Sequence, residues 1–341
     1  MKKVISLFLV MLLITSCGAK AGNGNSGGNS GDSKVVYTSF YPIEFATKEI
    51  VKDKMEVKSV IPAGVEVHDW EPSLKDITKL KESDLVLING LELEAWLEDA
   101  KKVVDEEKIV EVSKDIELIK VQEEDHDHDH EHEEEMEQAE ENEAKADHDH
   151  EHEGEDNHEG HHHHHNHGEY DPHIWLSIRN YEIVSKNIFE EVSRIDPENK
   201  DFYEENYNSL KKSLEDLDKK YTDGFKEYKG KHIIVPHEAF GYMAKDYNFV
   251  QIPIENITSD SETDLKRIAD IVDLAKKEGI DTVFYEGEAS GKVPETIAKE
   301  IGGEAKPIHT LEFITEEQEK NGDNYLTLME ENFKNMMESF K

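Results

Sequence analysis

The fold is decided at residues 35–61, which read VVYTSFYPIEFATKEIVKDKMEVKSVI. Residues 35–37 predict a short strand, the apolar spacing across 43–51 predicts an amphipathic helix, and residues 57–61 predict a second strand. A strand, a helix and another strand in this order are typical of a parallel pair of strands with a helix packed across one face. The beginning of the folded chain is therefore expected to be α/β.

The same alternation continues through the rest of the chain. Further strands are predicted at 85–88, 109–112, 233–235, 249–254, 282–285 and 305–309. Further helices are predicted at 74–80, 91–104, 240–247, 264–277, 293–301 and 325–340. Between the two halves, residues 178–229 are amphipathic and helical, interrupted only at Asp196-Pro197, where a second helix can begin. The expected fold is α/β, with two Rossmann-like lobes that contain small parallel sheets and are joined by a long helix.

The N-terminus indicates export. Lys2 and Lys3 precede an apolar run, 4–14, that is too short to span a bilayer, so residues 1–16 are predicted to be a signal peptide. The run ends in ITSC, which resembles the bacterial lipobox and implies that Cys17 is lipidated and anchors the protein outside the cytoplasm. Because Cys17 is the single cysteine, one molecule can form neither a disulfide nor a thiolate metal site.

Charge and composition divide the remaining chain. The sequence has 79 acidic and 39 basic side chains, a net charge of -40, which argues against nucleic-acid binding. Twenty of the acidic residues lie in 123–159, a stretch with almost no large apolar side chains that is expected to be flexible. The expected segments are a lipidated cysteine with a flexible tether (17–33), an N-terminal lobe (34–122), a His/Asp/Glu-rich loop (123–168), the end of the N-terminal lobe (169–177), the linking helix (178–229) and a C-terminal lobe (230–341).

Five of the nineteen histidines lie outside the acidic loop, and three of them have unusual neighbours. His68 lies in PAGVEVHDWEP, His173 in DPHIWL and His237 in PHEAFGY, directly after a predicted strand. Ligands of parallel sheets bind beyond the carboxyl ends of strands, so the loops with His68 and His237 are expected to line a cleft between the lobes. Imidazole with carboxylate and no thiolate suits zinc, although manganese, nickel and copper accept such ligands. The fourth ligand is expected to be an Asp or Glu of the second half.

Taken together, the lipobox, HDWEPS, DPHIWL, HEAFGY and VFYE resemble motifs of the zinc and manganese solute-binding lipoproteins of ABC transporters, over residues 1–341. The resemblance implies that His68, His173 and His237 are metal ligands. It points to Glu286 as the fourth ligand, with Glu288 as the alternative. Manganese-type members usually have an acidic residue at the third position, so His237 favours Zn2+.

The resemblance also accounts for the acidic loop, because zinc importers of this family carry a histidine-rich insertion between the first two ligand motifs. Here the insertion corresponds to residues 125–167. It is expected to bind further metal weakly, either to gather zinc or to sense its excess. The histidines expected to contribute are His126, His128, His130, His132, His148, His150, His152, His161, His162, His163, His164, His165 and His167.

A binding protein is favoured over an enzyme. His237-Glu238 begins a zinc-protease pattern, but position 241 is glycine where the second histidine should be, and four protein ligands leave no place for a catalytic water. The expected function is capture of extracytoplasmic zinc by a monomer that delivers it to an ABC permease and its ATPase. Zinc would join the two lobes while the long helix limits their hinge motion. The alternatives are a manganese-binding importer component and a surface adhesin that retains the fold.

Overall fold

The computed structural model describes residues 33–68, 70–121, 168–255, 265–287 and 291–341, and Lys34–Lys341 forms one compact unit. The predicted signal peptide, Cys17, the histidine-rich loop and Glu288 lie outside the described residues. Among the helices of the described ranges, none is both long and apolar enough to cross a membrane.

The first half contains a parallel sheet of four strands. These are β1 (Val35–Thr38), β2 (Glu56–Ser59), β3 (Leu85–Ile88) and β4 (Ile109–Glu111), in the order β2-β1-β3-β4. The helices of this half are α1 (Tyr41–Val51), α2 (Leu74–Lys79) and α3 (Leu97–Lys101), with 3-10 turns η1 (Leu80–Glu82) and η2 (Glu106–Lys108). All four residues of β3 are apolar and buried, as expected of an inner parallel strand that is covered on both faces.

The second half repeats this arrangement. Its strands are β5 (His232–His237), β6 (Val250–Glu255), β7 (Thr282–Tyr285) and β8 (Glu304–Pro307), all parallel and in the order β6-β5-β7-β8. Its helices are α6 (Gly241–Tyr247), α7 (Leu265–Glu278), α8 (Lys292–Ile301), α9 (Glu316–Asn321) and α10 (Tyr325–Ser339). In each sheet the first strand in sequence lies between the second and the third, so the strand order reverses at this strand. Doubly wound sheets bind ligands at such a reversal, beyond the carboxyl ends of the strands.

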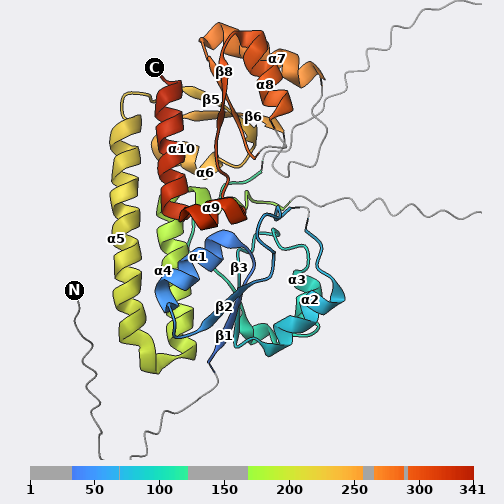
Figure 1. The fold of residues 1–341 in the computed structure, drawn as a ribbon, viewed down its shortest axis with the longest axis vertical. Coiled ribbons are helices and arrows are strands. Elements are labelled where there is room, and N and C mark those ends of the chain that lie inside the picture. The colour runs from blue at the N-terminus through green and yellow to red at the C-terminus, as the bar shows by residue number, and fades with distance from the viewer. Residues whose placement is uncertain (1–32, 69, 122–167, 256–264, 288–290) are drawn as a thin grey trace, which may run out of the picture. The chain divides into compact units, whose positions relative to one another are not determined.

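Helices α4 (Ile178–Ile195) and α5 (Lys200–Phe225) join the halves, and the interruption predicted at Asp196-Pro197 is the 3-10 turn η4 (Pro197–Asn199). Helix α5 packs against α1 of the first half and against α6 and α10 of the second (Figure 1). One hydrophobic core runs through both halves, with Phe40, Tyr181 and Phe240 among its fully buried members. The two sheets are therefore held against a common helical support.

Two elements differ from the sequence prediction. The helix predicted at 91–104 is shorter, Leu97–Lys101, and it cannot include Leu91 and Glu92, whose left-handed backbone angles (φ 58° and 63°) do not fit a right-handed helix. The buried Glu94 carboxylate closes this turn by accepting hydrogen bonds from the backbone N–H groups of Asn89 and Gly90, at 2.7 and 3.0 Å. Helix α9 was not predicted.

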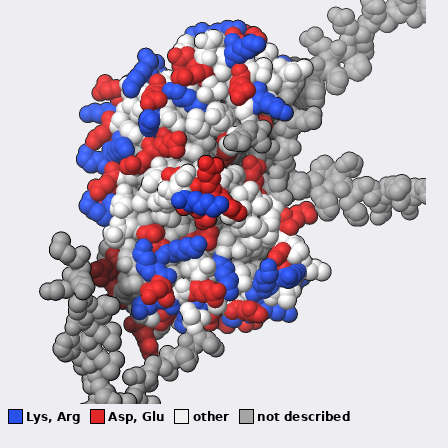
Figure 2. Space-filling view, in the orientation of Figure 1, with Lys and Arg blue, Asp and Glu red and all other residues white. Residues whose placement is uncertain are grey.

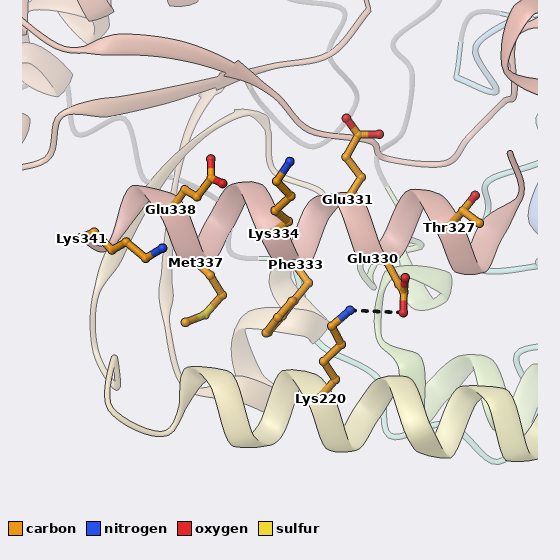
Figure 3. A pocket seen from close by; sticks show the side chains of 9 residues that line it. All are labelled: Lys220, Thr327, Glu330, Glu331, Phe333, Lys334, Met337, Glu338 and Lys341. Atoms are coloured by element: carbon orange, nitrogen blue, oxygen red, sulfur yellow. Dashed lines mark hydrogen bonds and ion pairs between the residues drawn. The ribbon is translucent and has the colours of Figure 1, made fainter. Parts of the chain in front are cut away.

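The contact between α5 and α10 depends on a glycine. A Cβ at Gly224 would lie 2.5 Å from the Phe333 ring, so a glycine lets this ring pack against α5. Figure 3 shows Phe333 in a surface groove between the two helices, beside the Lys220–Glu330 ion pair at 3.2 Å. Acidic and basic side chains are interspersed over the face of the molecule shown in Figure 2. Some oppositely charged side chains pair within one helix, such as Lys48 with Glu44 and Lys320 with Glu316.

Candidate metal centre

The three predicted histidines lie at a strand end, in a loop and just before a helical turn. His237 is the last residue of β5, the inner strand at which the second sheet reverses its order. His68 lies in the loop between β2 and α2. His173 directly precedes the 3-10 turn η3 (Ile174–Leu176), which leads into α4. The fold therefore brings together three residues separated by as many as 169 positions.

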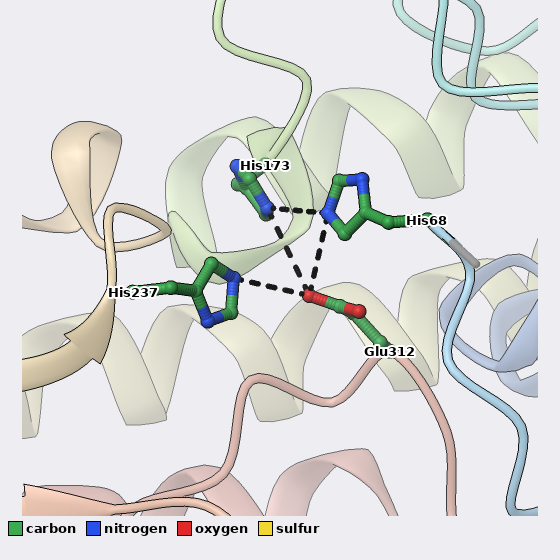
Figure 4. A group of neighbouring side chains, drawn as sticks. All are labelled: His68, His173, His237 and Glu312. Carbon is green, nitrogen blue, oxygen red and sulfur yellow. Dashed lines mark hydrogen bonds and ion pairs between the residues drawn. The ribbon is translucent and has the colours of Figure 1, made fainter. Parts of the chain in front are cut away.

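The side chains meet in one group together with Glu312 (Figure 4). One ligand atom from each residue lies within 4.8 Å of every other. His68 Nε2 is 3.2 Å from His173 Nε2, and Glu312 Oε1 is 3.3 Å from His237 Nε2 and 3.8 Å from the Nε2 atoms of the other two. Tetrahedral zinc with bonds of about 2.0–2.2 Å separates its ligand atoms by about 3.3–3.6 Å. Four of the six separations, at 3.2–3.8 Å, are thus already close to the spacing that a zinc ion requires, and the other two are within 4.8 Å.

Burial and missing hydrogen bonds also fit a metal. His173, His237 and Glu312 are almost fully buried, with 0%, 3% and 3% of their surface exposed. His237 Nε2 and Glu312 Oε1 are buried and lie 3.3 Å apart, but neither has a well-aligned hydrogen bond among the described residues. Buried polar atoms are costly unless they are satisfied, and a cation between these two atoms would satisfy both.

Glu312 is the residue of this group that the sequence analysis did not single out. It lies five residues beyond the end of β8, and the backbone of the preceding Leu311 is left-handed, with φ 64°. This conformation is unfavourable for leucine, so the packing around the loop must maintain it. A signal was present in the sequence, because Glu312 also follows a predicted strand of the second half.

A carboxylate orients His173. Asp171 Oδ1 accepts hydrogen bonds from His173 Nδ1, at 2.8 Å, and from the backbone N–H of His173, at 2.9 Å. Because Nδ1 carries the proton, Nε2 presents its lone pair to the metal position. The glycine that breaks the zinc-protease pattern belongs to this arrangement, since a Cβ at Gly241 would lie 2.7 Å from Asp171 Oδ2.

Glu286, which the family resemblance implied as the fourth ligand, is not in the group of four. Its Oε2 lies 3.9 Å from His237 Nδ1, the ring nitrogen that is not directed at Glu312. Its Oε1 accepts hydrogen bonds from the backbone N–H of Thr310, at 3.1 Å, and from the Thr310 hydroxyl. The carboxylate therefore lies beside the centre, behind the His237 ring.

The close carboxylates and imidazoles shift one another's pKa values. Burial lowers the pKa of His237, but the contact with Glu312 and the charges of Glu286 and Glu66 outweigh burial and raise it to about 9. Burial and the neighbouring Glu312 raise the pKa of Glu286 to about 8. Burial alone would raise the pKa of Glu312, but the three histidines lower it to about 2. Before metal binds, the centre thus holds protons that a cation must displace.

This fold and this site define a metal-binding protein with two α/β halves that share one buried His3Glu centre. Residues 36–339 match the family described as zinc-uptake complex component A, periplasmic. The chain belongs to this family, the zinc-binding solute-binding proteins of metal ABC transporters. Its members are transport components rather than enzymes, and the resemblance seen in the motifs is confirmed.

Two relatives of the chain are named as zinc uptake or zinc-binding proteins. The chain is 35% identical over 343 residues to the high-affinity zinc uptake system protein ZnuA of Bacillus subtilis, covering 99% of this chain and 98% of that protein. It is 36% identical over 306 residues to the zinc-binding protein AdcA of Streptococcus pyogenes. That match covers 90% of this chain but 56% of AdcA, so the chain spans just over half of that relative's length.

Solved structures share the fold over 90% of this chain. The metal-dependent lipoprotein YcdH of Bacillus subtilis has 32% identity and a TM-score of 0.69, with 98% of its chain covered. The Zn(II)-bound ZnuA-like domain of Streptococcus pneumoniae AdcA has 27% identity and a TM-score of 0.69, also with 98% covered. The laminin binding protein Lmb of Streptococcus agalactiae, described as having adhesin and metal transporting activity, has 26% identity and a TM-score of 0.70, with 100% covered.

Proposed function

We propose that this protein captures Zn2+ outside the cytoplasm with His68, His173, His237 and Glu312 and delivers it to an ABC importer. The observation that carries the proposal is the group of four ligand atoms within 4.8 Å of one another, four of whose six separations are close to those around a tetrahedral zinc ion. Three neutral imidazoles and one carboxylate give a zinc complex a net charge of about +1, which a buried site tolerates better than +2. Manganese prefers more oxygen ligands, so zinc is favoured over the manganese alternative.

The ligands come from both halves of the chain, which suggests how the loaded protein is recognised. His68 belongs to the first half, and His173 lies where the first half meets α4. His237 and Glu312 follow strands of the second half. A bound zinc therefore cross-links the halves, and a membrane permease can distinguish the linked state from the free one.

The proposed partners are a permease and its ATPase, on chains other than this one. Members of the family are components of zinc-uptake complexes, and they are extracytoplasmic.

We propose further that the chain acts as a monomer without nucleic-acid partners and is held at a bacterial membrane by lipid on Cys17. Replacing Cys17 with Ala should move the protein from the membrane fraction or leave an unprocessed precursor. Membrane retention of a fully processed Cys17→Ala protein would contradict the anchor.

The function is tested by metal analysis of untagged protein purified without added metal, followed by zinc titration against a competing chelator. One tight zinc per chain is expected. The His237→Ala variant should lose tight binding, whereas His232→Ala should retain it, because these two histidines occupy opposite ends of the same strand, β5. Glu312→Gln tests the proposed carboxylate ligand in the same assay. Equal losses in His232→Ala and His237→Ala would reject the site, and manganese bound more tightly than zinc would reject the metal.

A further inference from the structure

Glu286 lies between the two ligands that the second half supplies. The order of the second sheet is β6-β5-β7-β8, so β7 is flanked by the strands that lead to His237 and to Glu312. Glu286 is the first residue after β7. Because parallel strands end at the same edge of a sheet, its side chain emerges between the end of β5 and the loop after β8.

The two carboxylate oxygens of Glu286 face these two neighbours separately. Oε1 accepts from the N–H and the hydroxyl of Thr310, which is two residues before Glu312. Oε2 faces Nδ1 of His237 at 3.9 Å. The side chain of Glu286 is 14% exposed, so these contacts form largely away from water.

Glu286 and Glu312 approach opposite nitrogens of the His237 ring. Glu312 Oε1 is 3.3 Å from Nε2, on the side of the other two histidines, and Glu286 is on the side of Nδ1. The two ring nitrogens of imidazole point in diverging directions, so one metal ion takes only one of them. When Nε2 binds the metal, Nδ1 carries a proton, and a carboxylate facing that N–H sets the tautomer and the ring orientation.

The Thr310 loop is tied to His173 as well. The backbone carbonyl of Thr310 accepts a hydrogen bond of 2.7 Å from Trp175 Nε1, and Trp175 lies two residues after His173. Its ring is also packed against that of His173, with centroids 5.2 Å apart. Thr310 therefore connects the segment of one ligand to the carboxylate behind another.

We infer that Glu286 is a positioning residue that fixes the Nδ1–H tautomer of His237 with one oxygen and holds the Glu312 loop through Thr310 with the other. Its place at His237 is comparable to that of Asp171 at His173, although Glu286 Oε2 lies 3.9 Å from the Nδ1 it faces and Asp171 Oδ1 lies 2.8 Å from its own, and Glu286 also sets the distance between the two ligands of the second half. This role rests on the proposed function, because it presumes that zinc binds Nε2 of His237. Outer carboxylates of this kind contribute about 10- to 100-fold to metal affinity.

The test uses the full untagged chain and compares Glu286→Gln, Thr310→Val and Glu312→Gln, with Glu66→Gln as the control. Glu66 also acts on His237 through its charge, so its replacement controls for the loss of a nearby negative charge. Zinc affinity is measured by chelator competition. The visible spectrum of the cobalt(II)-substituted protein reports the coordination geometry, and the 15N shifts of the His237 ring report its tautomer and the partner of Nδ1–H.

Glu286→Gln should weaken zinc binding about 10- to 100-fold, shift the His237 Nδ1 resonance and keep the tetrahedral cobalt spectrum. Thr310→Val should weaken binding less, and Glu312→Gln should change the cobalt spectrum. A changed cobalt spectrum in Glu286→Gln would make Glu286 a ligand and overturn the inference. Affinity and Nδ1 shift equal to those of Glu66→Gln would overturn it too. Failure of the proposed function can be distinguished from failure of this inference, because the unaltered protein would then bind no zinc in the same titration.

Discussion

Raising the pH from 7 to 8.5 should tighten zinc binding by about 25-fold, because zinc must displace a proton from His237. The carboxylate of Glu312, reinforced by Glu286, raises the pKa of this imidazole to about 9 in the metal-free protein. At pH 7 the ring is then neutral in about one molecule in 100, and at pH 8.5 in about one in four. Apparent affinity should therefore rise nearly tenfold per pH unit and level off only above about pH 9.

An ordinary histidine predicts a different curve. With a pKa near 6.5 the neutral fraction grows by about 1.3-fold between pH 7 and 8.5, so affinity would be almost constant over this range. Chelator competition at half-unit pH steps, corrected for the protonation of the chelator, separates the two curves. Calorimetry in buffers of different ionisation enthalpy should also show at least one proton released per zinc at pH 7. An affinity that is flat above pH 7.5 would refute the reasoning.

The same shifts give the metal-free protein the opposite dependence. The folded-state pKa of His237 is raised from 6.5 to about 9 and that of Glu286 from 4.5 to about 8, so each stabilises the fold at low pH and loses this contribution as pH rises through the folded value. Glu312, lowered to about 2, loses its contribution only as pH falls through that value. Thermal unfolding with chelator present should therefore show a Tm that falls from pH 7 to 9, while the Tm gain on adding zinc grows.

Three further changes test separate parts of the structure. Asp171→Asn should weaken zinc binding about 10- to 100-fold by chelator competition, because the Nδ1–H of His173 loses its charged acceptor. Gly224→Ala should lower the free energy of unfolding in urea titration, because the new methyl group displaces the Phe333 ring at a cost of about 1–3 kcal/mol. The higher helix propensity of alanine offsets up to about 1 kcal/mol of this cost. Deleting residues 123–167 should retain one tight zinc and remove weaker sites in calorimetry, and loss of the tight site would place it in that segment.

Much of the fold could be predicted from local sequence because parallel strands have a strong signature. The run LVLI at 85–88 is apolar throughout and forms β3, and residues 233–235 lie within β5. The three motif histidines were equally visible, because each stands beside a turn or a strand end. These features depend on near neighbours in the chain, which is the information that a sequence contains directly.

The two helices that differed from the sequence prediction, α3 and α9, depend on packing between distant residues or on a capping motif that the prediction did not use. The late start of α3 follows from burial of Glu94, whose carboxylate binds the backbone of Asn89 and Gly90. Nothing in the local pattern shows that this glutamate is buried. Helix α9 had a usable cue in Thr315 and Gln318, a threonine followed three residues later by glutamine, and these side chains form a capping box.

The comparison of Glu286 with Glu312, the proposed fourth ligand, shows that strand positions alone do not separate the two candidates. Both residues follow strands of the second half, and Glu286 follows its strand more closely. Yet a residue directly beyond β7 lies level with the end of the adjacent β5, so it meets His237 from behind the ring. A carboxylate reaches the Nε2 side of the His237 ring only from a longer loop that extends past the strand end and turns back. In the loop after β8, Leu311, with its left-handed backbone, lies at that turn. The strained backbone of the buried Leu311 is therefore a better guide to the proposed ligand than the number of residues between a candidate glutamate and the preceding strand.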